Sequence, residues 1–387
     1  MSEWKCYKLN DISSLSNGIN FDKSAYTSGV KLIGVSDFKN RIHPDYDSLQ
    51  EVDSKVVKSG DYLEKGDIVF VRSNGNKELV GRCMMIDRDI PVTYSGFCIK
   101  LRLKDKKIFD PVFFNYLFKT RQFKKSMTGT AVGANIQNLS QSRLGSCEVN
   151  VPDIETQKKI ATILSRYDSL IENYQKQIKL LEEAAQRLYK EWFVDHHFPG
   201  HENTKIVDGV PEGWEEKSIS EVFDFKYGKI LPTKDFVEDG PIPVYGASKQ
   251  IGRYTKANCF EPKVLIGSRG NAGFVHRTIE DETYVTNNSF IVEPCAKYGY
   301  LKLPFIFESF KVLDFVAICT GAAQPQLTLN SISSLKYIVP IKDLIVKYCG
   351  ITTCYFSKIA LAYKQIHLLT EARDRLLPRL MNGEFDV

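Results

Sequence analysis

The chain contains nearly the same thirteen residues twice, and this internal repeat constrains its fold more than any other feature. KQIKLLEEAAQRL begins at Lys176 and KQIHLLTEARDRL begins at Lys364, 188 positions later, and nine of the thirteen residues are identical. The same spacing relates Leu139 to Leu327. Self-similarity over such a span predicts a duplicated architecture.

Upstream of the repeat the spacing between the two copies drifts. WKCYKLNDISSLSNG begins at Trp4 and WEEKSISEVFDFKYG at Trp214, an offset of 210, whereas SNGN at Ser73 and SRGN at Ser268 are 195 apart. Each copy is therefore predicted to consist of a variable globular part followed by a segment of constrained length.

Length and composition place the chain among intracellular globular proteins. Its 387 residues predict two to three domains, and 43% hydrophobic residues can build their cores. MSEWKCYKLN lacks the apolar core of a secretory signal, and no stretch approaches the roughly 20 uninterrupted apolar residues that span a bilayer. Nine cysteines without a C-x-x-C pair predict reduced thiols, so we expect a cytoplasmic protein. A net charge of +5 is compatible with a polyanionic partner but does not require one.

Apolar residues recur alternately four and three positions apart in both repeated segments, as in helices that pack along their whole length. The first seam is Ile160, Leu164, Tyr167, Ile171, Tyr174, Ile178, Leu181, Ala185, Leu188 and Trp192. The second, more mixed seam is Tyr348, Thr352, Tyr355, Ile359, Ala362, Ile366, Leu369, Arg373, Leu376 and Leu380. A helix of roughly 33 residues would be about 50 Å long.

A single helix cannot bury its own seam. We expect the two helices to pack together within the chain, because two matched seams on one chain meet at high effective concentration. The alternative is a homo-oligomeric coiled coil in which each helix pairs with another molecule. Pro378, where the first copy has Lys190, is expected to bend or stop the second helix about a turn early.

The globular parts combine strand and helix patterns. DIVFVRSNG, YSGFCIKLRL and CEVNVP in the first copy, and KVLIGSRGN, NNSFIVEP and LKYIVP in the second, are short apolar runs bounded by turn residues. PVFFNYLFKTRQFKKSM and YLKLPFIFESFKVLDFV each predict one apolar helix. Each part is therefore predicted to be a mixed α/β domain.

Polar side chains that can bind nucleic acid concentrate in the Gly-rich connections. Arg suits guanine and Asn or Gln suits adenine in the major groove, while Ser, Lys and backbone amides suit phosphates. The candidate DNA-binding residues are Arg72, Ser73, Asn74, Asn76, Lys77, Asn135, Gln137, Asn138, Ser268, Arg269, Asn271, Gln324 and Gln326. For any one of them a simple turn role is the plainer interpretation.

Sequence patterns of catalysis are missing. The chain has no G-x-x-x-x-G-K-[ST] loop, no H-E-x-x-H and no N-P-P-[FY] motif of an adenine methyltransferase. DHHFPGH has three histidines but no second ligand cluster. We therefore expect a protein without catalytic residues, metal or cofactor; a nuclease or methyltransferase with an unrecognised site is the opposing hypothesis.

Several motifs together resemble those of one family. EEAAQRLYKEWFVDHHFPGH followed by GVPEGWEEKSISEV, GANIQNLS before VPDIETQKKIATIL, and RDRLLPRLMNGEFDV resemble conserved regions of the specificity (S) subunits of Type I restriction-modification systems. The resemblance runs from end to end of the chain. The second copy departs from it, because IKDLIVKYCGI lacks the Glu155 and Gln157 pair of the first.

The resemblance implies two target recognition domains, residues 1–152 and 201–340, separated by two long conserved helices within 153–200 and 341–387. These helices would form an intramolecular antiparallel coiled coil, giving an internal repeat with pseudo-two-fold symmetry. Such a subunit is non-catalytic; each of its domains reads one half of a split duplex DNA target, and the helices set the gap. The expected helix length of about 50 Å corresponds to a gap of roughly 15 base pairs. Its partners are DNA, two modification (methyltransferase) subunits and restriction subunits. The alternative function is a non-catalytic coiled-coil scaffold with two protein- or glycan-binding domains.

Overall fold

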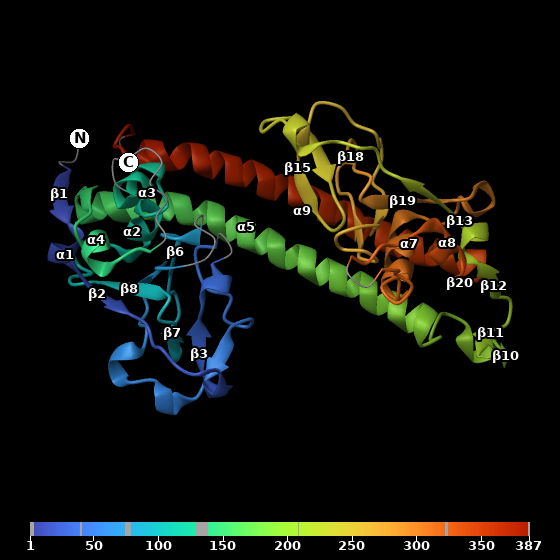
Figure 1. The fold of residues 1–387 in the computed structure, drawn as a ribbon, viewed down its shortest axis with the longest axis horizontal. Coiled ribbons are helices and arrows are strands. Elements are labelled where there is room, and N and C mark those ends of the chain that lie inside the picture. The colour runs from blue at the N-terminus through green and yellow to red at the C-terminus, as the bar shows by residue number, and fades with distance from the viewer. Residues whose placement is uncertain are drawn as a thin grey trace. The chain divides into compact units, whose positions relative to one another are not determined.

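The chain forms two compact units that share its two long helices. The computed structural model describes residues 4–38, 41–73, 79–128, 138–207, 209–321 and 324–385. Unit 1 comprises Met1–Glu172 and His367–Val387, and unit 2 comprises Asn173–Ile366. The division between the units falls inside α5 (Ile154–Tyr189) and inside α9 (Lys342–Met381), so each unit contains a part of both helices (Figure 1).

Unit 1 is a mixed α/β structure. Its strands are β1 (Lys5–Lys8), β2 (Ser13–Asn17), β3 (Tyr26–Ile33), β4 (Gln50–Val52), β5 (Ile68–Val71), β6 (Cys83–Met85), β7 (Val92–Tyr94), β8 (Cys98–Leu103) and β9 (Glu148–Val151). Its shorter helices are α1 (Leu9–Ile12), α2 (Pro111–Leu117), α3 (Arg121–Thr128) and α4 (Gln141–Gly145).

Unit 2 has the same kind of composition. Its strands are β10 (Ile206–Val207), β11 (Val210–Pro211), β12 (Glu215–Ser218), β13 (Phe223–Tyr227), β14 (Ile242–Tyr245), β15 (Gln250–Tyr254), β16 (Val264–Gly267), β17 (Val275–Arg277), β18 (Tyr284–Val285), β19 (Ser289–Pro294) and β20 (Lys336–Val339). Its shorter helices are α6 (Ile219–Val222), α7 (Leu303–Lys311) and α8 (Leu329–Ser333). The expected mixed α/β composition is confirmed in both units.

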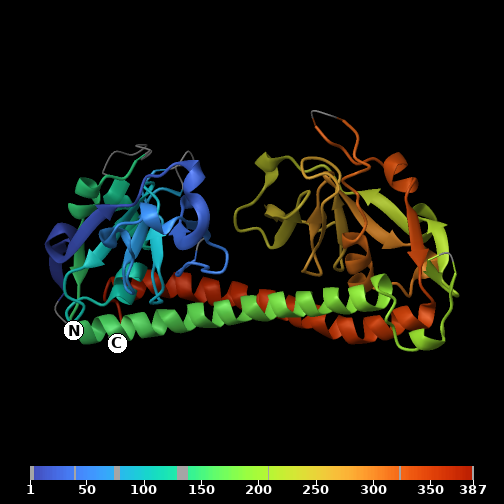
Figure 2. The ribbon, with the colours of Figure 1, turned by 90° about the horizontal axis from the view of Figure 1, so that it is seen from below.

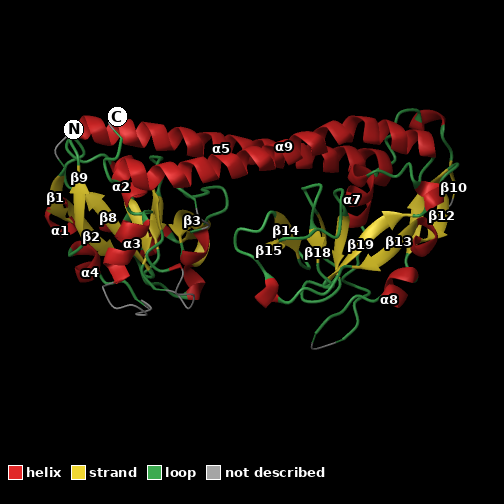
Figure 3. Cartoon of the chain, turned by 90° about the horizontal axis from the view of Figure 1, so that it is seen from above, coloured by secondary structure: helices red, strands yellow, loops and turns green. Residues whose placement is uncertain are grey.

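One sheet topology occurs in both units. Unit 1 contains a four-stranded sheet of order β2-β8-β5-β6, a three-stranded sheet of order β4-β3-β7, and the ladder β1-β9. Unit 2 contains the corresponding orders β13-β19-β16-β17 and β15-β14-β18 and the ladder β12-β20, together with the hairpin β10-β11 (Figure 3). In each three-stranded sheet one pair, β3 with β7 or β14 with β18, is parallel. The sequence repeat therefore corresponds to a repeated topology.

The central sheet of unit 1 is buried on both faces, which explains the uninterrupted apolar run in β5. Ile68 and Phe70 face a core formed with α2 and the helix segments, whereas Val69 and Val71 face a second core against the three-stranded sheet. All four side chains are fully buried. A strand covered on both sides has no face that favours polar residues.

The two long helices run antiparallel within each unit. In unit 1, Ile160 and Leu164 of α5 belong to the same core as Leu380 and Met381 of α9. In unit 2, Ile178 packs with Ile359, and Tyr348 Oη donates a hydrogen bond to the Ala185 carbonyl at 3.2 Å. Figure 2 shows the segments of α5 and α9 lying side by side in this unit.

The ends of the long helices follow local chemistry. Asp153 begins α5, because its carboxylate accepts hydrogen bonds from the backbone N–H groups of Glu155 and Thr156, both at 3.0 Å. Of the two outcomes expected at Pro378, a bend or a stop, the stop is wrong, because α9 continues to Met381. The proline removes one backbone donor, whereas the turn beyond it buries Leu380 and Met381 in the core of unit 1.

The first copy changes its helix type where the second has this proline. Lys190–Val194 forms a π-helical turn directly after α5. Trp192 and Phe193, neighbours in sequence, are both buried there. A π turn holds one more residue than an α turn.

The apolar helix expected from PVFFNYLFKTRQFKKSM is two helices. α2 ends at Leu117 and α3 begins at Arg121. Between them Thr120 Oγ1 donates to the Leu117 carbonyl at 2.7 Å and accepts from Phe123 N–H at 3.2 Å. The threonine therefore ends one helix and caps the next, a local competition that hydrophobic spacing does not reveal.

By length and composition, α9 is apolar enough to cross a membrane. Its most apolar 18-residue window is 39% buried inside the structure. Leu344, Ile345 and Tyr348 belong to the core of unit 2, so these apolar residues stabilise the fold of the protein itself.

Candidate nucleic-acid interface

Three segments of unit 1 meet at the carboxyl end of β5. The backbone N–H groups of Arg72 and Ser73 donate to the Phe97 carbonyl at 2.8 and 3.4 Å, and Leu139 N–H donates to the Arg72 carbonyl at 2.7 Å. Ser73 and Asn138 form an isolated antiparallel bridge. We call this arrangement the loop junction of unit 1; it fixes the backbone of two segments that the sequence suggested for DNA binding.

Unit 2 contains an equivalent loop junction. Ser268 and Arg269 N–H donate to the Asn288 carbonyl at 2.7 and 3.4 Å, Leu327 N–H donates to the Ser268 carbonyl at 3.0 Å, and Arg269 bridges Gln326. The two units thus share one hydrogen-bond pattern at this place.

The hydrogen bonds correct the sequence alignment of the two junctions. They make Arg72 equivalent to Ser268 and Ser73 equivalent to Arg269. Pairing Ser73 with Ser268 is therefore wrong by one residue. The letters common to SNGN and SRGN reflect turn chemistry, whereas the strands before them set the true register.

In unit 1 the candidate side chains differ in exposure. Arg72 is half-buried, and its Nη1 donates to the Gly96 carbonyl at 3.4 Å, while Ser73 is half-buried and Asn138 is exposed. Phe97, which sequence reasoning did not select, is 62% exposed beside them. The other candidates of this unit lie outside the described residues: Asn74, Asn76, Lys77, Asn135 and Gln137.

In unit 2 the candidates divide into exposed and supporting side chains. Arg269 and Gln324 are exposed and Gln326 is half-buried. Asn271 is exposed and donates to Ser248 Oγ at 2.6 Å. Ser268 is 1% exposed, and its hydroxyl donates to the Asn287 carbonyl at 3.2 Å, so it supports the loop from inside.

A histidine is buried next to this junction. His276 on β17 lies against the rings of Tyr245 and Phe274, at centroid distances of 6.3 and 6.1 Å. Burial lowers the pKa of His276 to about 4, so the ring is neutral at pH 7. Its place in the core gives it a packing role.

A buried carboxylate connects the globular part of unit 1 to both helix segments. Tyr116 on α2 donates to Asp168 on α5 at 2.5 Å, and Arg373 on α9 forms an ion pair with the same carboxylate and a second one with Asp374 at 2.7 Å. Burial and the charge of Asp168 raise the pKa of Tyr116, which keeps its proton on the hydroxyl. Sequence reasoning did not select this cluster, although Arg373 is the only charged residue in either predicted seam.

Unit 2 makes the corresponding connection differently. Arg277 on β17 lies 4.6 Å from the ring centre of Phe356 on α9 and 3.4 Å from Glu182 on α5. Burial lowers the pKa of Arg277, and the charge of Glu182 opposes this. A cation over an aromatic ring replaces the tyrosine–aspartate–arginine cluster of unit 1.

Gln157 also has a structural role. It is 1% exposed; its side-chain nitrogen donates to the carbonyls of Ile108 and Pro152 at 3.0 and 2.8 Å, and its oxygen accepts from Asp110 N–H at 2.8 Å. At the position 188 residues later the second copy has Ile345, which is fully buried among apolar residues. The two halves therefore attach their helices unequally.

The predicted seam residues face the interior. All of the following are buried or half-buried: Ile160, Leu164, Tyr167, Ile171, Tyr174, Ile178, Leu181, Leu188, Trp192, Tyr355, Ile359, Ala362, Ile366, Leu369 and Leu376. In the part of the chain that the structure describes, no three His, Cys, Asp or Glu side chains are grouped so as to hold a metal ion.

Comparison with known proteins identifies the family. The family described as Type I restriction modification DNA specificity domain matches residues 1–183 and 211–348, more than half of the chain. The Type I restriction enzyme MjaIX specificity subunit of Methanocaldococcus jannaschii is 27% identical to this chain, and the match covers 70% of this chain and 68% of the length of that subunit. The HindI specificity subunit of Haemophilus influenzae is 25% identical over 99% of this chain and 100% of its own.

Similarity to a solved structure extends to the fold. The crystal structure of the Type I restriction-modification S subunit from M. genitalium has a TM-score of 0.62 and 21% identity, covering 98% of this chain and 96% of that one. The chain therefore belongs to the family of Type I restriction-modification specificity subunits, the non-catalytic components that recognise DNA.

Proposed function

We propose that the chain reads a bipartite duplex DNA target, with one half of the target bound by each of its recognition domains, 1–152 and 201–340. The observation that carries this proposal is the loop junction, which has the same hydrogen-bond pattern in both units. A duplicated reading surface suits a target with two separate half-sites. The two half-sites of the DNA target would differ in sequence, because the side chains at the two loop junctions differ. Ser73 of unit 1 stands where unit 2 has Arg269.

The junctions supply both kinds of contact that such a protein needs. Arg72, Arg269 and Gln324 would reach base edges in the major groove, where an Arg fork matches guanine and an amide matches adenine. Exposed amides such as Asn138 and Asn271 would reach base edges or phosphates. The candidates outside the described residues stay predictions of the same kind: Asn74, Asn76, Lys77, Asn135 and Gln137.

We further propose that segments 153–200 and 341–387 form an antiparallel coiled coil within the chain and set the distance between the half-sites. Support comes from the antiparallel packing of both helices inside each unit and from the burial of the seam residues. The 36 residues of α5 correspond to about 54 Å of helix, or about 16 base pairs. The repeat would then relate the two halves by pseudo-two-fold symmetry.

The proposed partners follow from family membership. Two modification subunits would bind the chain and methylate adenine after flipping it out of the duplex. Restriction subunits would join for cleavage, and the complex would act in the cytoplasm. The specificity subunit would contribute position and sequence choice.

Exchange of one domain tests independent reading. The full chain is co-expressed with its modification subunits, and methylated adenines are mapped across the host genome. A split consensus is expected, and replacing residues 1–152 by the corresponding domain of another family member should change one half of it only. A change in both halves, or methylation without a split consensus, would overturn the proposal.

A single substitution tests the junction. Arg269→Ala is expected to relax one position of one half-site, with a loss of about 1 to 3 kcal/mol in discrimination. Lys205→Ala, which removes an exposed charge just before β10, is the control and should keep the consensus. A scaffold that binds protein or glycan would show no salt-sensitive retention on duplex DNA in either form.

A further inference from the structure

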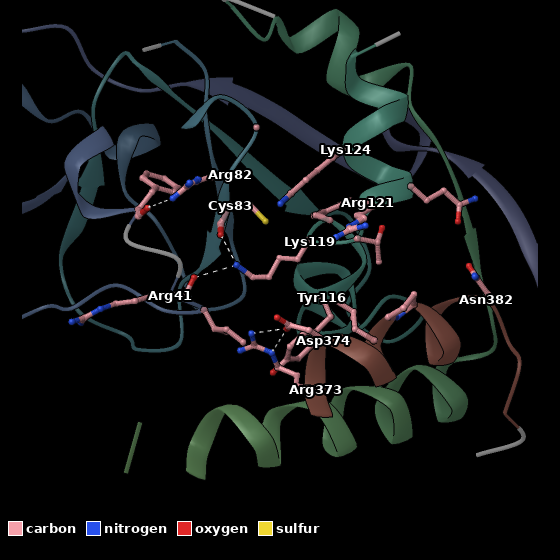
Figure 4. Close-up of a pocket in the computed structure, with 18 residues that line it drawn as sticks. Arg41, Arg82, Cys83, Tyr116, Lys119, Arg121, Lys124, Arg373, Asp374 and Asn382 are labelled. Atoms are coloured by element: carbon pink, nitrogen blue, oxygen red, sulfur yellow. Dashed lines mark hydrogen bonds and ion pairs between the residues drawn. The ribbon is translucent and has the colours of Figure 1, made fainter. Parts of the chain in front are cut away.

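Unit 1 contains a cavity of about 860 Å³ between α2, α3, β6 and the last turns of α9. Figure 4 shows the side chains of Lys119 and Lys124 extending into the space between these elements, whereas Arg41 points away from them. Its volume is in the range of sites that bind small molecules. The cavity is not part of the loop junction.

The lining of this cavity is strongly cationic. Six basic residues line it: Arg41, Arg82, Lys119, Arg121, Lys124 and Arg373. Asp374 is the only carboxylate among the lining residues that the structure describes. The rings of Phe38, Tyr116 and Phe118 complete the wall. The cavity thus combines excess positive charge with aromatic surface.

Some of these cations already have partners. Arg373 is paired with Asp168 and Asp374, and Arg41 lies 2.8 Å from Asp45. For Lys119, Arg121 and Lys124, no ion pair forms with any carboxylate in the described parts of the chain. Three positive charges at one cavity are therefore left to solvent or to a bound anion.

Lys119 is the most confined of the three. Its Nζ donates to the carbonyls of Arg41 and Cys83 at 3.1 and 2.8 Å, which leaves one of its three N–H groups for a ligand. Burial lowers the pKa of Lys119, and the positive charges of Lys124 and Arg373 lower it further against the pull of Asp168. A bound anion would relieve this repulsion.

The second unit provides an internal comparison. By the common Phe-Lys pair at the end of α2 and α7, Lys119 corresponds to Lys311 and Tyr116 to Glu308. Lys311 is paired with Glu308 at 3.0 Å. In unit 2 the charge of Lys311 is thus neutralised by Glu308 of the same helix. In unit 1 Tyr116 stands where unit 2 has this glutamate, so Lys119 has no such partner on α2.

We propose that the cavity of unit 1 is a binding site for a phosphate ester. Arg121 offers a planar fork and Lys119 and Lys124 offer point charges, the groups that proteins use for phosphate oxygens. The phosphate can come from a free nucleotide or from the backbone of bound DNA. The Arg82 carbonyl accepts a hydrogen bond from Val71 N–H at 2.9 Å, one residue before Arg72 of the loop junction, so occupancy would act next to residues that we propose contact DNA.

The first experiment uses free ligands. Titration calorimetry of the full chain with ATP and with inorganic pyrophosphate is compared among the wild type, the double variant Arg121→Gln/Lys124→Gln, and Lys125→Gln. Arg121, Lys124 and Lys125 are exposed on α3, but Lys125 does not line the cavity. If a free nucleotide is the source, binding should fall at least tenfold in the double variant and stay within twofold in the control.

The second experiment uses duplex DNA and rests on the proposed function. If backbone phosphate is the source, the double variant should reduce the slope of log K against log salt by about 1 to 2 with sequence preference unchanged, and Lys125→Gln should keep the slope. The proposal is overturned if the double variant changes neither nucleotide binding nor the salt slope, or if the control loses as much. A wild type without DNA binding would count against the proposed function alone, because the calorimetry still decides the cavity.

Discussion

Asp168 joins three helices of unit 1 through a single carboxylate. It accepts from Tyr116 on α2 and pairs with Arg373 on α9, and it is 8% exposed. Removing one partner of a buried charged cluster leaves the others without compensation. The residue therefore determines how the globular part of unit 1 attaches to its helices.

Asp168→Asn tests this role, because it keeps the shape of the side chain and removes its charge. We expect the free energy of unfolding of unit 1 to fall by about 2 to 3 kcal/mol, measured by urea denaturation with circular dichroism. The exposed pair of Glu155 and Lys158 supplies the control, and Glu155→Gln should cost less than about 1 kcal/mol. An equal loss of unfolding free energy in the two variants would contradict the role of Asp168 in attaching the globular part of unit 1 to its helices.

His276 predicts a pH dependence of unit 2. Burial lowers its pKa in the folded protein from 6.5 to about 4, so below pH 6.5 the unfolded chain binds a proton that the folded chain does not. The free energy of unfolding is therefore not reduced by His276 above pH 6.5, the pKa of this histidine in the unfolded chain. It falls as the pH drops from 6.5 toward 4.

His276→Phe isolates this effect, since it fills the site with a ring that does not titrate. Between pH 7 and pH 5 the wild type should lose about 2 kcal/mol more than the variant in urea denaturation. Parallel pH profiles for both proteins would show that the histidine does not titrate as described.

At the scale of elements, the sequence predicted whether a segment forms a helix or a strand better than it predicted where that helix or strand begins and ends. Seam spacing indicated both long helices, and apolar runs indicated β5, β8, β9, β16, β19 and β20. The break at Thr120, the helical continuation through Pro378 and the π turn at Lys190 were not predicted, because side-chain capping and tertiary burial decide them.

The candidate site was predictable only in part, for physical reasons of the same kind. Loop composition selected Arg269 and Gln324, which are exposed. It could not separate them from Ser268, because the burial of Ser268 depends on the turn that carries Asn287. Phe97 was missed because an exposed aromatic residue has no distinguishing pattern in one sequence.

Ile359 tests the packing of the helix pair in unit 2. Its side chain is fully buried against Ile178, whereas Leu361, two residues later on α9, is 57% exposed. Ile359→Ala should lower the free energy of unfolding by about 2 to 4 kcal/mol, because it leaves a cavity, and Leu361→Ala by less than about 1. Thermal unfolding with matched urea titrations measures both, and a reversed order would refute the packing.

At the scale of the whole molecule, the proposed spacer role of the helices makes a numerical prediction. Removing one heptad from each helix, residues 173–179 and 358–364 around the contact of Ile178 with Ile359, preserves the seam. The helices shorten by about 10 Å, so the gap in the methylated consensus should shorten by about 3 base pairs.

The control replaces the same two heptads by others of equal length and apolar pattern, and its gap should stay unchanged. Genome-wide mapping of methylated adenines measures the gap for the wild type, the shortened chain and the control. An unaltered gap in the shortened chain, with both half-sites still recognised, would exclude the spacer role.

The division of α9 between the units also bears on how the protein is made. Unit 2 is continuous in sequence from Asn173 to Ile366, but the core of unit 1 includes Leu380 and Met381. A ribosome that has delivered the first 172 residues has not yet delivered the segment that covers Leu164. The half translated first is thus completed last, and a premature stop codon after Ile366 would leave the earlier-made half open while the later-made half keeps all of its residues.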